Sequence, residues 1–290
     1  MRENGFQAPP DQAEAIGRIV GSGGRVLVLG PVDVGKSAFC RLLLEAGAQA
    51  GRRVALVDAD PGQKTVGPPA AVTLARGPDL RLAGLAFVGA VDVLRAPARV
   101  ARGVEAALAR LAGEGGADLA AINSAGLVTR PGHGLIRALI AAARPDAIVA
   151  IGGGEALAPA LAGARAPILA LDPSPRARRK SAGARARARR EAFAAYFAEA
   201  EIRRLRLDAA ARAALADAPD GLLLGLCPIE PCGDALALLA GRDGEEALLL
   251  APQEVPRAPS TDAPLPARIV PGFVTLDPDW RAAPLPAPEP

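Results

Sequence analysis

The sequence predicts an α/β fold in which helices flank a mainly parallel sheet, followed by a small C-terminal antiparallel β domain. Up to about residue 207, short apolar runs alternate with amphipathic segments, which is typical of strand–helix–strand units. Beyond Asp208, apolar runs follow one another with only turn residues between them, which indicates antiparallel strands. A glycine-rich loop also joins the first apolar run to a helix.

The predicted elements of the larger domain begin with a helix over Asp11–Val20 and a strand over Arg25–Leu29. Short apolar runs predict the further strands, at Arg53–Val57, Val72–Leu74, Leu85–Val88, Leu119–Ile122, Ala147–Ile151 and Pro167–Leu171. Apolar residues at helical spacing predict a helix from Ser37 onward and others over Arg99–Leu111, Gly134–Ala143 and Glu155–Leu161.

The predicted C-terminal domain contains strands at Gly221–Cys227, Ala235–Leu239 and Ala247–Leu250. Asp243-Gly244 offers a hairpin turn between the last two, and a further pair, Arg268–Val270 and Phe273–Leu276, surrounds Pro271-Gly272. We place the larger domain over 1–207, with an arginine-rich segment at about 174–200, and the β domain over 208–280. The proline-rich tail 281–290 is expected to be disordered.

Length and composition limit which kinds of protein this chain can be. At 290 residues, half of them hydrophobic, the chain can hold one α/β domain and a smaller one. Three cysteines are too few and too scattered for the disulfide framework of a secreted protein. Met1–Pro10 lacks the apolar core of a signal peptide, and no apolar run reaches membrane-spanning length. We therefore expect a cytoplasmic protein that has no membrane contact.

The basic residues are unevenly distributed. Eight of them and no acidic residue lie between Arg176 and Arg190, whereas acidic residues outnumber basic ones in the rest of the chain. A focused patch of this kind favours a polyanionic ligand, although a solvated helix face is the alternative. Phe193, Tyr196 and Phe197 follow at helical spacing, and this packing pattern favours the first interpretation.

The glycine-rich loop has the complete phosphate-loop pattern G-x-x-x-x-G-K-[ST]. Because a strand precedes it and a helix follows it, its backbone N–H groups and the helix N-terminus are expected to cradle phosphate oxygens. Lys36 would bridge the β- and γ-phosphates and the Ser37 hydroxyl would hold Mg²⁺. Only three of the 34 basic residues are lysines, so a lysine here indicates that a compact charge is required. The loop predicts a P-loop NTPase fold, with the nucleotide bound by Gly30, Pro31, Val32, Asp33, Val34, Gly35, Lys36, Ser37 and Ala38.

Two carboxylates, Asp58 and Asp60, follow the next buried strand. P-loop folds place the carboxylate that handles Mg²⁺ in this region. One carboxylate could hold the metal while the other accepts a proton from an attacking hydroxyl. The alternative is a single metal-handling Asp with a solvated neighbour. Asn123, at the end of a later strand, is interpreted as a turn residue.

Several motifs together resemble the P-loop polynucleotide 5′-hydroxyl kinases. The phosphate loop, Asp58-Ala-Asp-Pro-Gly-Gln63 and Ile122-Asn-Ser-Ala-Gly-Leu-Val128 occur in that family's order and spacing. The resemblance continues through an arginine-bearing lid and covers roughly Pro9 to Ala200; the lid residues are Lys180, Ser181, Arg185, Arg189, Arg190, Tyr196 and Phe197.

This resemblance implies transfer of the γ-phosphate of ATP to the 5′-hydroxyl of RNA or DNA, with Mg²⁺ as cofactor. It implies that Lys36, Asp60, Arg185 and Arg189 are catalytic, with Asp60 deprotonating the 5′-hydroxyl and the arginines stabilising the transferring phosphoryl group. Ser37 and Asp58 would serve the metal. The substrate end would be held by Gln63, Ser124, Gly126 and Leu127.

Two stretches depart from the family pattern. Leu127 stands where many members have Trp, which removes a base-stacking platform worth about 1–3 kcal/mol. Ala90–Arg95 replaces a Ser-Pro-x-Gly-His stretch and introduces Asp92.

Two other functions remain open at this point. One is a nucleotide-dependent switch or assembly ATPase without phosphotransfer, and the other is a kinase for a nucleoside or other small hydroxyl compound. The absence of an Asn/Thr-Lys-x-Asp motif favours ATP over GTP. Protein partners are not indicated by the sequence.

Overall fold

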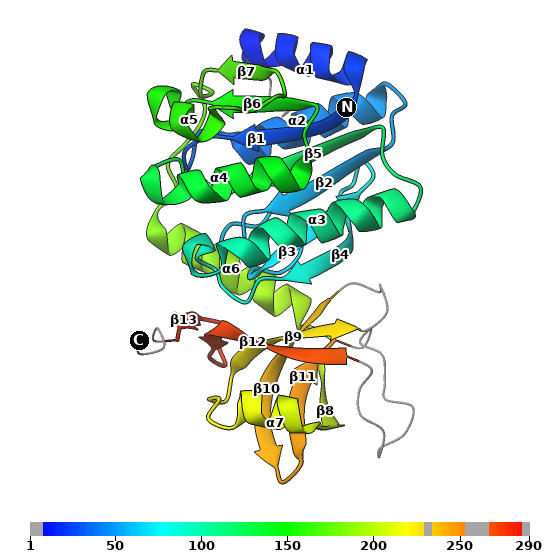
Figure 1. Ribbon diagram of the computed structural model, residues 1–290, viewed down its shortest axis with the longest axis vertical. Helices are drawn as coiled ribbons and strands as arrows, with labels where there is room; N and C mark the ends of the chain where they lie inside the picture. The colour runs from blue at the N-terminus through cyan, green and yellow to red at the C-terminus, as the bar shows by residue number, and fades with distance from the viewer. Residues whose placement is uncertain (1–7, 229–233, 253–266, 286–290) are drawn as a thin grey trace. The chain divides into compact units, whose positions relative to one another are not determined.

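The computed structural model describes residues 8–228, 234–252 and 267–285 (Figure 1). The chain forms two compact units. The first contains the residues up to Asp60 together with Leu74–Ala83 and Val104–Lys180, and the second contains Pro61–Thr73, Gly84–Gly103 and the chain from Ser181 onward. The larger domain predicted from sequence therefore contributes to both units.

The larger sheet confirms the predicted α/β fold. Its strand order is β4-β3-β2-β5-β1-β6-β7, and the pairs β2–β5, β5–β1, β1–β6 and β6–β7 are all parallel. The strands are β1 Gly24–Leu29, β2 Val54–Ala59, β3 Ala71–Arg76, β4 Arg81–Phe87, β5 Leu119–Ser124, β6 Ala147–Ile151 and β7 Ile168–Leu171.

Helices cover the parallel strands. They are α1 Pro10–Ser22, α2 Lys36–Gln49, α3 Pro97–Gly113, α4 Arg130–Ala143 and α5 Gly154–Leu161, with a short 3₁₀ turn η1 at Val93–Arg95. α2 packs against β1, β2 and β5, while α4 packs against β1 and α5; α4 crosses the near face in Figure 1. Because the sheet is covered, β2 and β5 are buried along their whole length. Within the described ranges, none of the helices is long and apolar enough to span a membrane.

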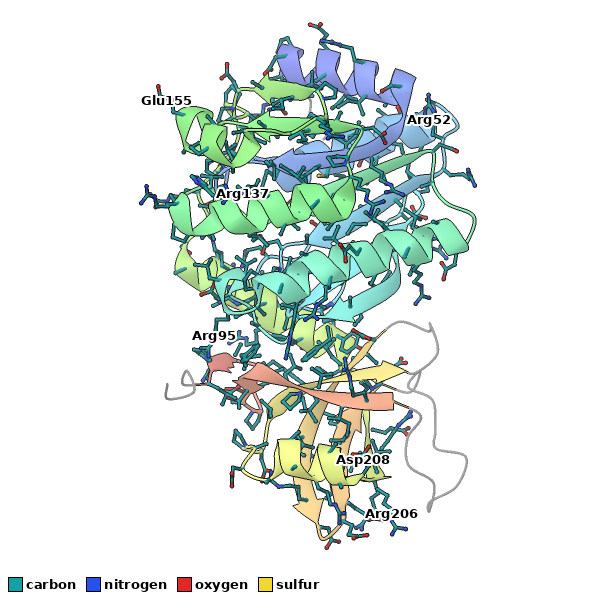
Figure 2. All side chains as sticks on the ribbon, in the orientation of Figure 1. Arg52, Arg95, Arg137, Glu155, Arg206 and Asp208 are labelled. Atoms are coloured by element: carbon teal, nitrogen blue, oxygen red, sulfur yellow. The ribbon has the colours of Figure 1, made fainter. Side chains whose placement is uncertain are left out.

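The second sheet is antiparallel, with the order β13-β12-β9-β10-β11-β8. Its strands are β8 Glu201–Arg206, β9 Leu222–Pro228, β10 Ala235–Asp243, β11 Glu246–Ala251, β12 Ala267–Leu276 and β13 Ala282–Pro284, and the second unit also contains helices α6 Ala182–Tyr196 and α7 Ala209–Leu215. The β10–β11 hairpin turns at Gly244, as predicted, with Asp243 paired to Glu246. Asp208 caps α7, because its Oδ1 accepts the Ala211 N–H at 2.7 Å (Figure 2).

The predicted pair of strands around Pro271-Gly272 is wrong. The two segments form the single strand β12, whose pairing with β9 shifts register between Pro271 and Thr275. Proline and glycine are typical of such irregularities, since proline has no N–H to donate and glycine permits close backbone approach. A Cβ on Gly272 would lie only 2.6 Å from the Leu223 carbonyl oxygen.

The sequence-based boundaries also differ from the structure. β8 pairs with β11, so the second sheet begins before residue 208, and Ala282–Pro284 of the predicted disordered tail pairs with β12. β8 has a charged residue at four of its six positions and buries only Leu205, so it lacks the apolar run that marked the other strands. Residues 286–290 of the tail lie outside the described residues.

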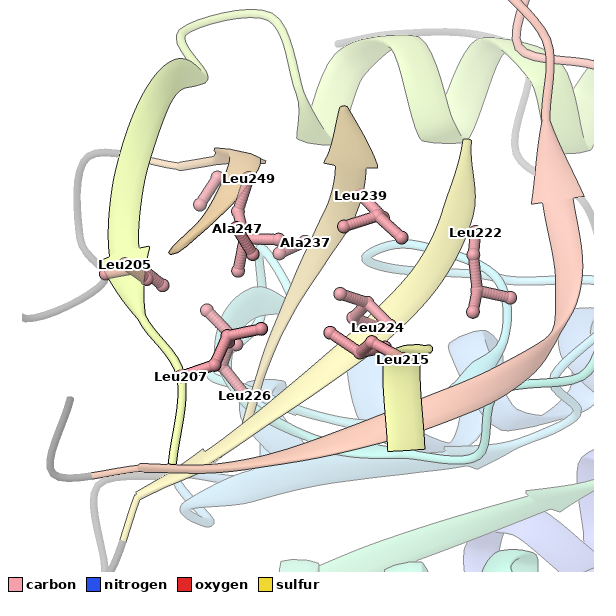
Figure 3. Packing of buried hydrophobic residues seen from close by; sticks show 11 residues of the cluster. Leu205, Leu207, Leu215, Leu222, Leu224, Leu226, Ala237, Leu239, Ala247 and Leu249 are labelled. Carbon is pink, nitrogen blue, oxygen red and sulfur yellow. The ribbon is translucent and has the colours of Figure 1, made fainter. Parts of the chain in front are cut away.

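Two apolar clusters lie on the two faces of this sheet. Leu222, Leu224 and Leu226 of β9 belong to one cluster, which contains Leu215 of α7 (Figure 3). Leu223 belongs to the other, which contains Phe193 and the neighbouring Phe197 at the end of α6. Because successive side chains of a strand point to opposite faces, burial of both faces explains why β9 has leucines at consecutive positions instead of alternating apolar and polar residues.

Gly225 of β9 is required by this packing. A Cβ there would lie 2.3 Å from Cδ1 and 2.8 Å from Cβ of Phe87, so rotating the ring would not relieve the clash. We expect Gly225→Ala to lower the free energy of unfolding by about 1–3 kcal/mol, measured by denaturant titration. Gly241→Ala is the matched control, because its Cβ would meet nothing closer than 3.7 Å. Equal stability of the two variants would contradict this packing.

The ion pair between Arg53 and Asp118 makes stability depend on pH. Hydrogen bonds from the Arg53 side chain and N–H, helped by its charge, lower the pKa of Asp118 from 3.8 to about 2. The stabilisation is therefore present above pH 3.8 and lost as pH falls toward 2. Asp118→Asn should flatten this part of the stability–pH curve, measured by thermal unfolding across that range. An unchanged slope would mean that other carboxylates dominate it.

Candidate functional site

The phosphate loop connects β1 to α2, as the sequence predicts. Gly30 and Gly35 have φ of 151° and 99°, conformations that side chains rarely adopt. A Cβ on Gly30 would also lie 2.2 Å from the Ile151 carbonyl oxygen at the end of β6. Gly35 precedes the first turn of α2, and its carbonyl accepts the Phe39 N–H at 2.9 Å. The loop is therefore held between two strand ends and a helix N-terminus.

Lys36 lies inside this loop. Its ammonium donates a hydrogen bond to the Pro31 carbonyl at 2.7 Å, and only 8% of the residue is exposed. Burial lowers the pKa of Lys36, while the negative charges of Asp60, Asp33 and Asp58 act in the opposite direction. The burial of Cys40 raises the pKa of its thiol. A compact charge is thus held against the loop backbone and opposite a group of carboxylates.

The strand order determines which polar groups meet Ser37. β5 lies between β2 and β1, and its Asn123 is in register with both Asp58 and Val28. The Asn123 amide nitrogen donates to Asp58 Oδ1 at 3.1 Å and to Ser37 Oγ at 3.3 Å. The two predicted metal-binding residues are therefore brought together through a third residue.

The two aspartates have different surroundings. Asp58 is fully buried, whereas Asp60 is partly exposed beyond the end of β2. The Asp60 N–H donates to Asp58 Oδ1 at 3.2 Å, which fixes the turn that separates the two carboxylates. This difference is compatible with distinct roles, one carboxylate near Ser37 and the other as the leading electrostatic partner of Lys36.

The oxygen ligands available here fit Mg²⁺. Hydroxyl, carboxylate and amide oxygens are the ligands that this hard cation prefers, and it usually takes the rest from phosphates and water. Ser37 Oγ and Asp58 supply that chemistry, and the Asn123 amide nitrogen holds the two together. In the part of the chain that the structure describes, no group of three His, Cys, Asp or Glu side chains is placed so that it could hold a metal ion.

The residues predicted to hold the substrate end, other than Gln63, lie at the end of β5 and just beyond it. Ser124 is buried and donates its hydroxyl to the Val28 carbonyl at 2.8 Å, an interaction that joins β5 to β1. Gly126 packs against the phosphate loop, because a Cβ there would lie 2.6 Å from the nitrogen of Val32. Leu127 packs on Gly132 of α4, where a Cβ would lie 2.6 Å from Leu127 Cγ. Their contact with substrate stays a prediction.

The remaining predicted residues belong to the second unit. The Gln63 amide donates to the Gly62 carbonyl at 2.6 Å. Arg185 and Arg189 are partly buried and lie one turn apart on α6, whose N-terminus is capped by Ser181. In the first unit, Asp33 of the phosphate loop accepts the backbone N–H of Lys180 at 3.1 Å, the residue directly before this cap.

Comparison with known proteins identifies a family whose matched region contains these site residues. The sequence model of the family described as mRNA cleavage and polyadenylation factor CLP1 P-loop matches residues 30–199. The chain belongs to this family. The match begins at Gly30 of the phosphate loop and extends beyond α6, so it contains every site residue considered above.

The similar curated proteins include archaeal ones. A polyribonucleotide 5′-hydroxyl-kinase of Pyrococcus furiosus is 31% identical over 209 residues, which are 68% of this chain and 58% of that protein. One from Pyrococcus abyssi is 31% identical over 63% of this chain and 53% of that protein. The Clp1 polyribonucleotide 5′-hydroxyl-kinase of Xenopus tropicalis is 48% identical over 68 residues, 23% of this chain and 15% of its own. The chain thus spans little more than half the length of the archaeal relatives.

A solved structure of a Clp1p–Pcf11p complex supports the same fold. It matches with a TM-score of 0.68 and covers 90% of this chain and 77% of that one, at 10% sequence identity. A similarity at this identity concerns the fold alone.

The contacts of Asn123 are not evident from its place in the sequence. It was interpreted as a turn residue, whereas its amide links Asp58 to Ser37. A polar residue at the end of a fully buried strand was the available signal, but its neighbours depend on the strand order, which sequence alone does not give.

The contact between Gly126 and Val32 leads to a test. A Cβ at position 126 would lie within 2.7 Å of both the nitrogen and Cα of Val32, so the phosphate-loop backbone must move. We expect Gly126→Ala to weaken ATP binding at least about tenfold, equivalent to about 1.4 kcal/mol, measured by calorimetry. Gly134→Ala in α4 is the control, since a Cβ there meets no atom within 4 Å. Wild-type affinity in Gly126→Ala would show that the loop can accommodate the methyl group.

Proposed function

We propose that this chain is an ATP-dependent polynucleotide 5′-hydroxyl kinase, which transfers the γ-phosphate of ATP to the 5′-hydroxyl end of RNA or DNA. The observation that supports it most is the buried Lys36, bonded to the Pro31 carbonyl within the phosphate loop, with Asp58 and Ser37 linked through one amide at the same strand edge. The related proteins named as polyribonucleotide 5′-hydroxyl-kinases supply the reaction class. A solved structure of the interface between Pcf11p and Clp1p, which concerns ATP loss in a point mutant, supports ATP as the nucleotide.

In this proposal the 5′-hydroxyl oxygen attacks the γ-phosphorus, and the bond to the bridging oxygen of ADP breaks. Asp60 accepts the hydroxyl proton, for which its partly exposed position beyond β2 is suited. Lys36 neutralises charge on the β- and γ-phosphates, and the loop N–H groups orient them. When bound through Ser37 and Asp58, Mg²⁺ supplies further charge neutralisation there.

The arginines of α6 complete the proposed mechanism. Arg185 and Arg189 would place positive charge on the transferring phosphoryl group, whose transition state spreads negative charge over its equatorial oxygens. Positive groups of this kind contribute much of the rate enhancement in phosphoryl transfer. Gln63, three residues beyond Asp60, would contact the substrate end.

One observation favours a second function, a nucleotide-dependent switch without phosphotransfer. Leu127 provides no aromatic surface, and its side chain packs on Gly132. A chain that binds ATP but holds the terminal nucleotide weakly would behave in this way.

A phosphotransfer assay separates the two. With γ-labelled ATP and 5′-hydroxyl oligonucleotides of RNA and DNA, we expect label at the 5′ end. Lys36→Ala should reduce transfer by at least about 100-fold, while Arg137→Ala, which removes an exposed positive charge from α4, should match wild type. ATP binding without labelled oligonucleotide would refute the kinase and support the switch.

A further inference from the structure

Asn123 is a neutral side chain buried next to the carboxylate of Asp58. It lies at the end of β5, the strand between the phosphate-loop strand β1 and the aspartate-bearing strand β2. The residue is 2% exposed and the neighbouring Asp58 is fully buried. A second carboxylate in place of the amide would put two like charges side by side without solvent, which is unfavourable. The neutral amide avoids this repulsion and also supplies two protons.

Both amide protons of Asn123 are used. One is donated to Asp58 Oδ1 and the other to Ser37 Oγ. Because the serine hydroxyl receives a hydrogen bond from one side, its own proton and its second lone pair are directed elsewhere. The same amide therefore sets the orientation of both predicted metal-binding groups.

The carbonyl oxygen of the Asn123 side chain has no hydrogen-bond partner among the described residues, although it is buried. Buried polar atoms without partners are rare and call for a physical explanation. This oxygen belongs to the side chain whose nitrogen bonds the Ser37 hydroxyl and the Asp58 carboxylate, so all three groups offer hard oxygen acceptors of the kind that attract a hydrated divalent cation.

We propose that Asn123 is a positioning residue for Mg²⁺-bound nucleotide, acting by orienting Ser37 and Asp58. The proposal rests on nucleotide binding and requires no phosphotransfer. Partners that orient metal ligands in this way typically change metal affinity 10–100-fold when removed. A purely structural amide would instead change stability and affect nucleotide binding equally with and without the metal.

The test is a calorimetric measurement of ATP affinity in Mg²⁺ and in EDTA. We expect Asn123→Ala to lose about 10–100-fold in affinity with Mg²⁺ and to match wild type in EDTA. Asn123→Leu keeps the number of side-chain heavy atoms while removing both donors, and it should show the same metal-specific loss without a cavity. Gln12→Ala is the matched control, because it removes another buried amide, which donates to the Asp172 carbonyl in the same unit; its ATP affinity should be that of wild type under both conditions.

A double-mutant cycle tests the route of the effect. If Asn123 acts through Ser37, adding Asn123→Ala to Ser37→Ala should reduce Mg²⁺-dependent affinity far less than it does in wild type. Equal weakening in Mg²⁺ and EDTA, no weakening in either, or additive losses in the cycle would each overturn the proposal. Because only binding is measured, loss of the kinase hypothesis in the oligonucleotide assay would leave this result intact.

Discussion

The parallel pairing of β2, β5 and β1 is the constraint on which the site depends. Parallel strands end at the same edge of a sheet, so polar residues that follow buried strands collect there. Register places Asp58 beside Asn123 and Asn123 beside Val28, two residues before the phosphate loop. The Ser124 hydroxyl bonded to Val28 reinforces this alignment. A shift of one residue in either pairing would turn the Asn123 side chain to the opposite face and separate Asp58 from Ser37.

Burial of Lys36 adds an electrostatic condition to that geometry. An ammonium taken out of water is costly unless hydrogen bonds and opposite charges compensate. The Pro31 carbonyl supplies the hydrogen bond, and Asp60, Asp33 and Asp58 supply the charges. The chain otherwise uses arginine for nearly all its positive charge, but a planar guanidinium would not fit inside the loop. The lysine and the aspartates are therefore parts of one arrangement, and removing either side leaves the other uncompensated.

Sequence was sufficient for features that depend on neighbouring residues. The strand–loop–helix around Lys36, the buried strand before Asp58 and the hairpin at Gly244 are local patterns, and all three were predicted. The role of Asn123 depends on β5 lying between β1 and β2, a relation between segments far apart in the chain. β8 was missed because arginine and glutamate occupy most of its positions. Pro271-Gly272 was interpreted as a turn because the same residue types also occur at irregular points of a paired strand.

The second sheet gives the arginines of α6 a structural context. Arg185, Arg189, Phe193 and Phe197 follow one another at intervals of four residues, which places consecutive members on neighbouring turns of one helix face. Phe193 and Phe197 are buried with Leu223 and Leu236 of the second sheet, and the Tyr196 hydroxyl accepts the Leu236 N–H at 3.0 Å. Arg187 lies on another face, with a side chain 68% exposed. The two partly buried arginines therefore continue the anchored side of the helix. A solvated arginine-rich helix would not require that alignment, whereas a lid whose arginines must keep a fixed direction would.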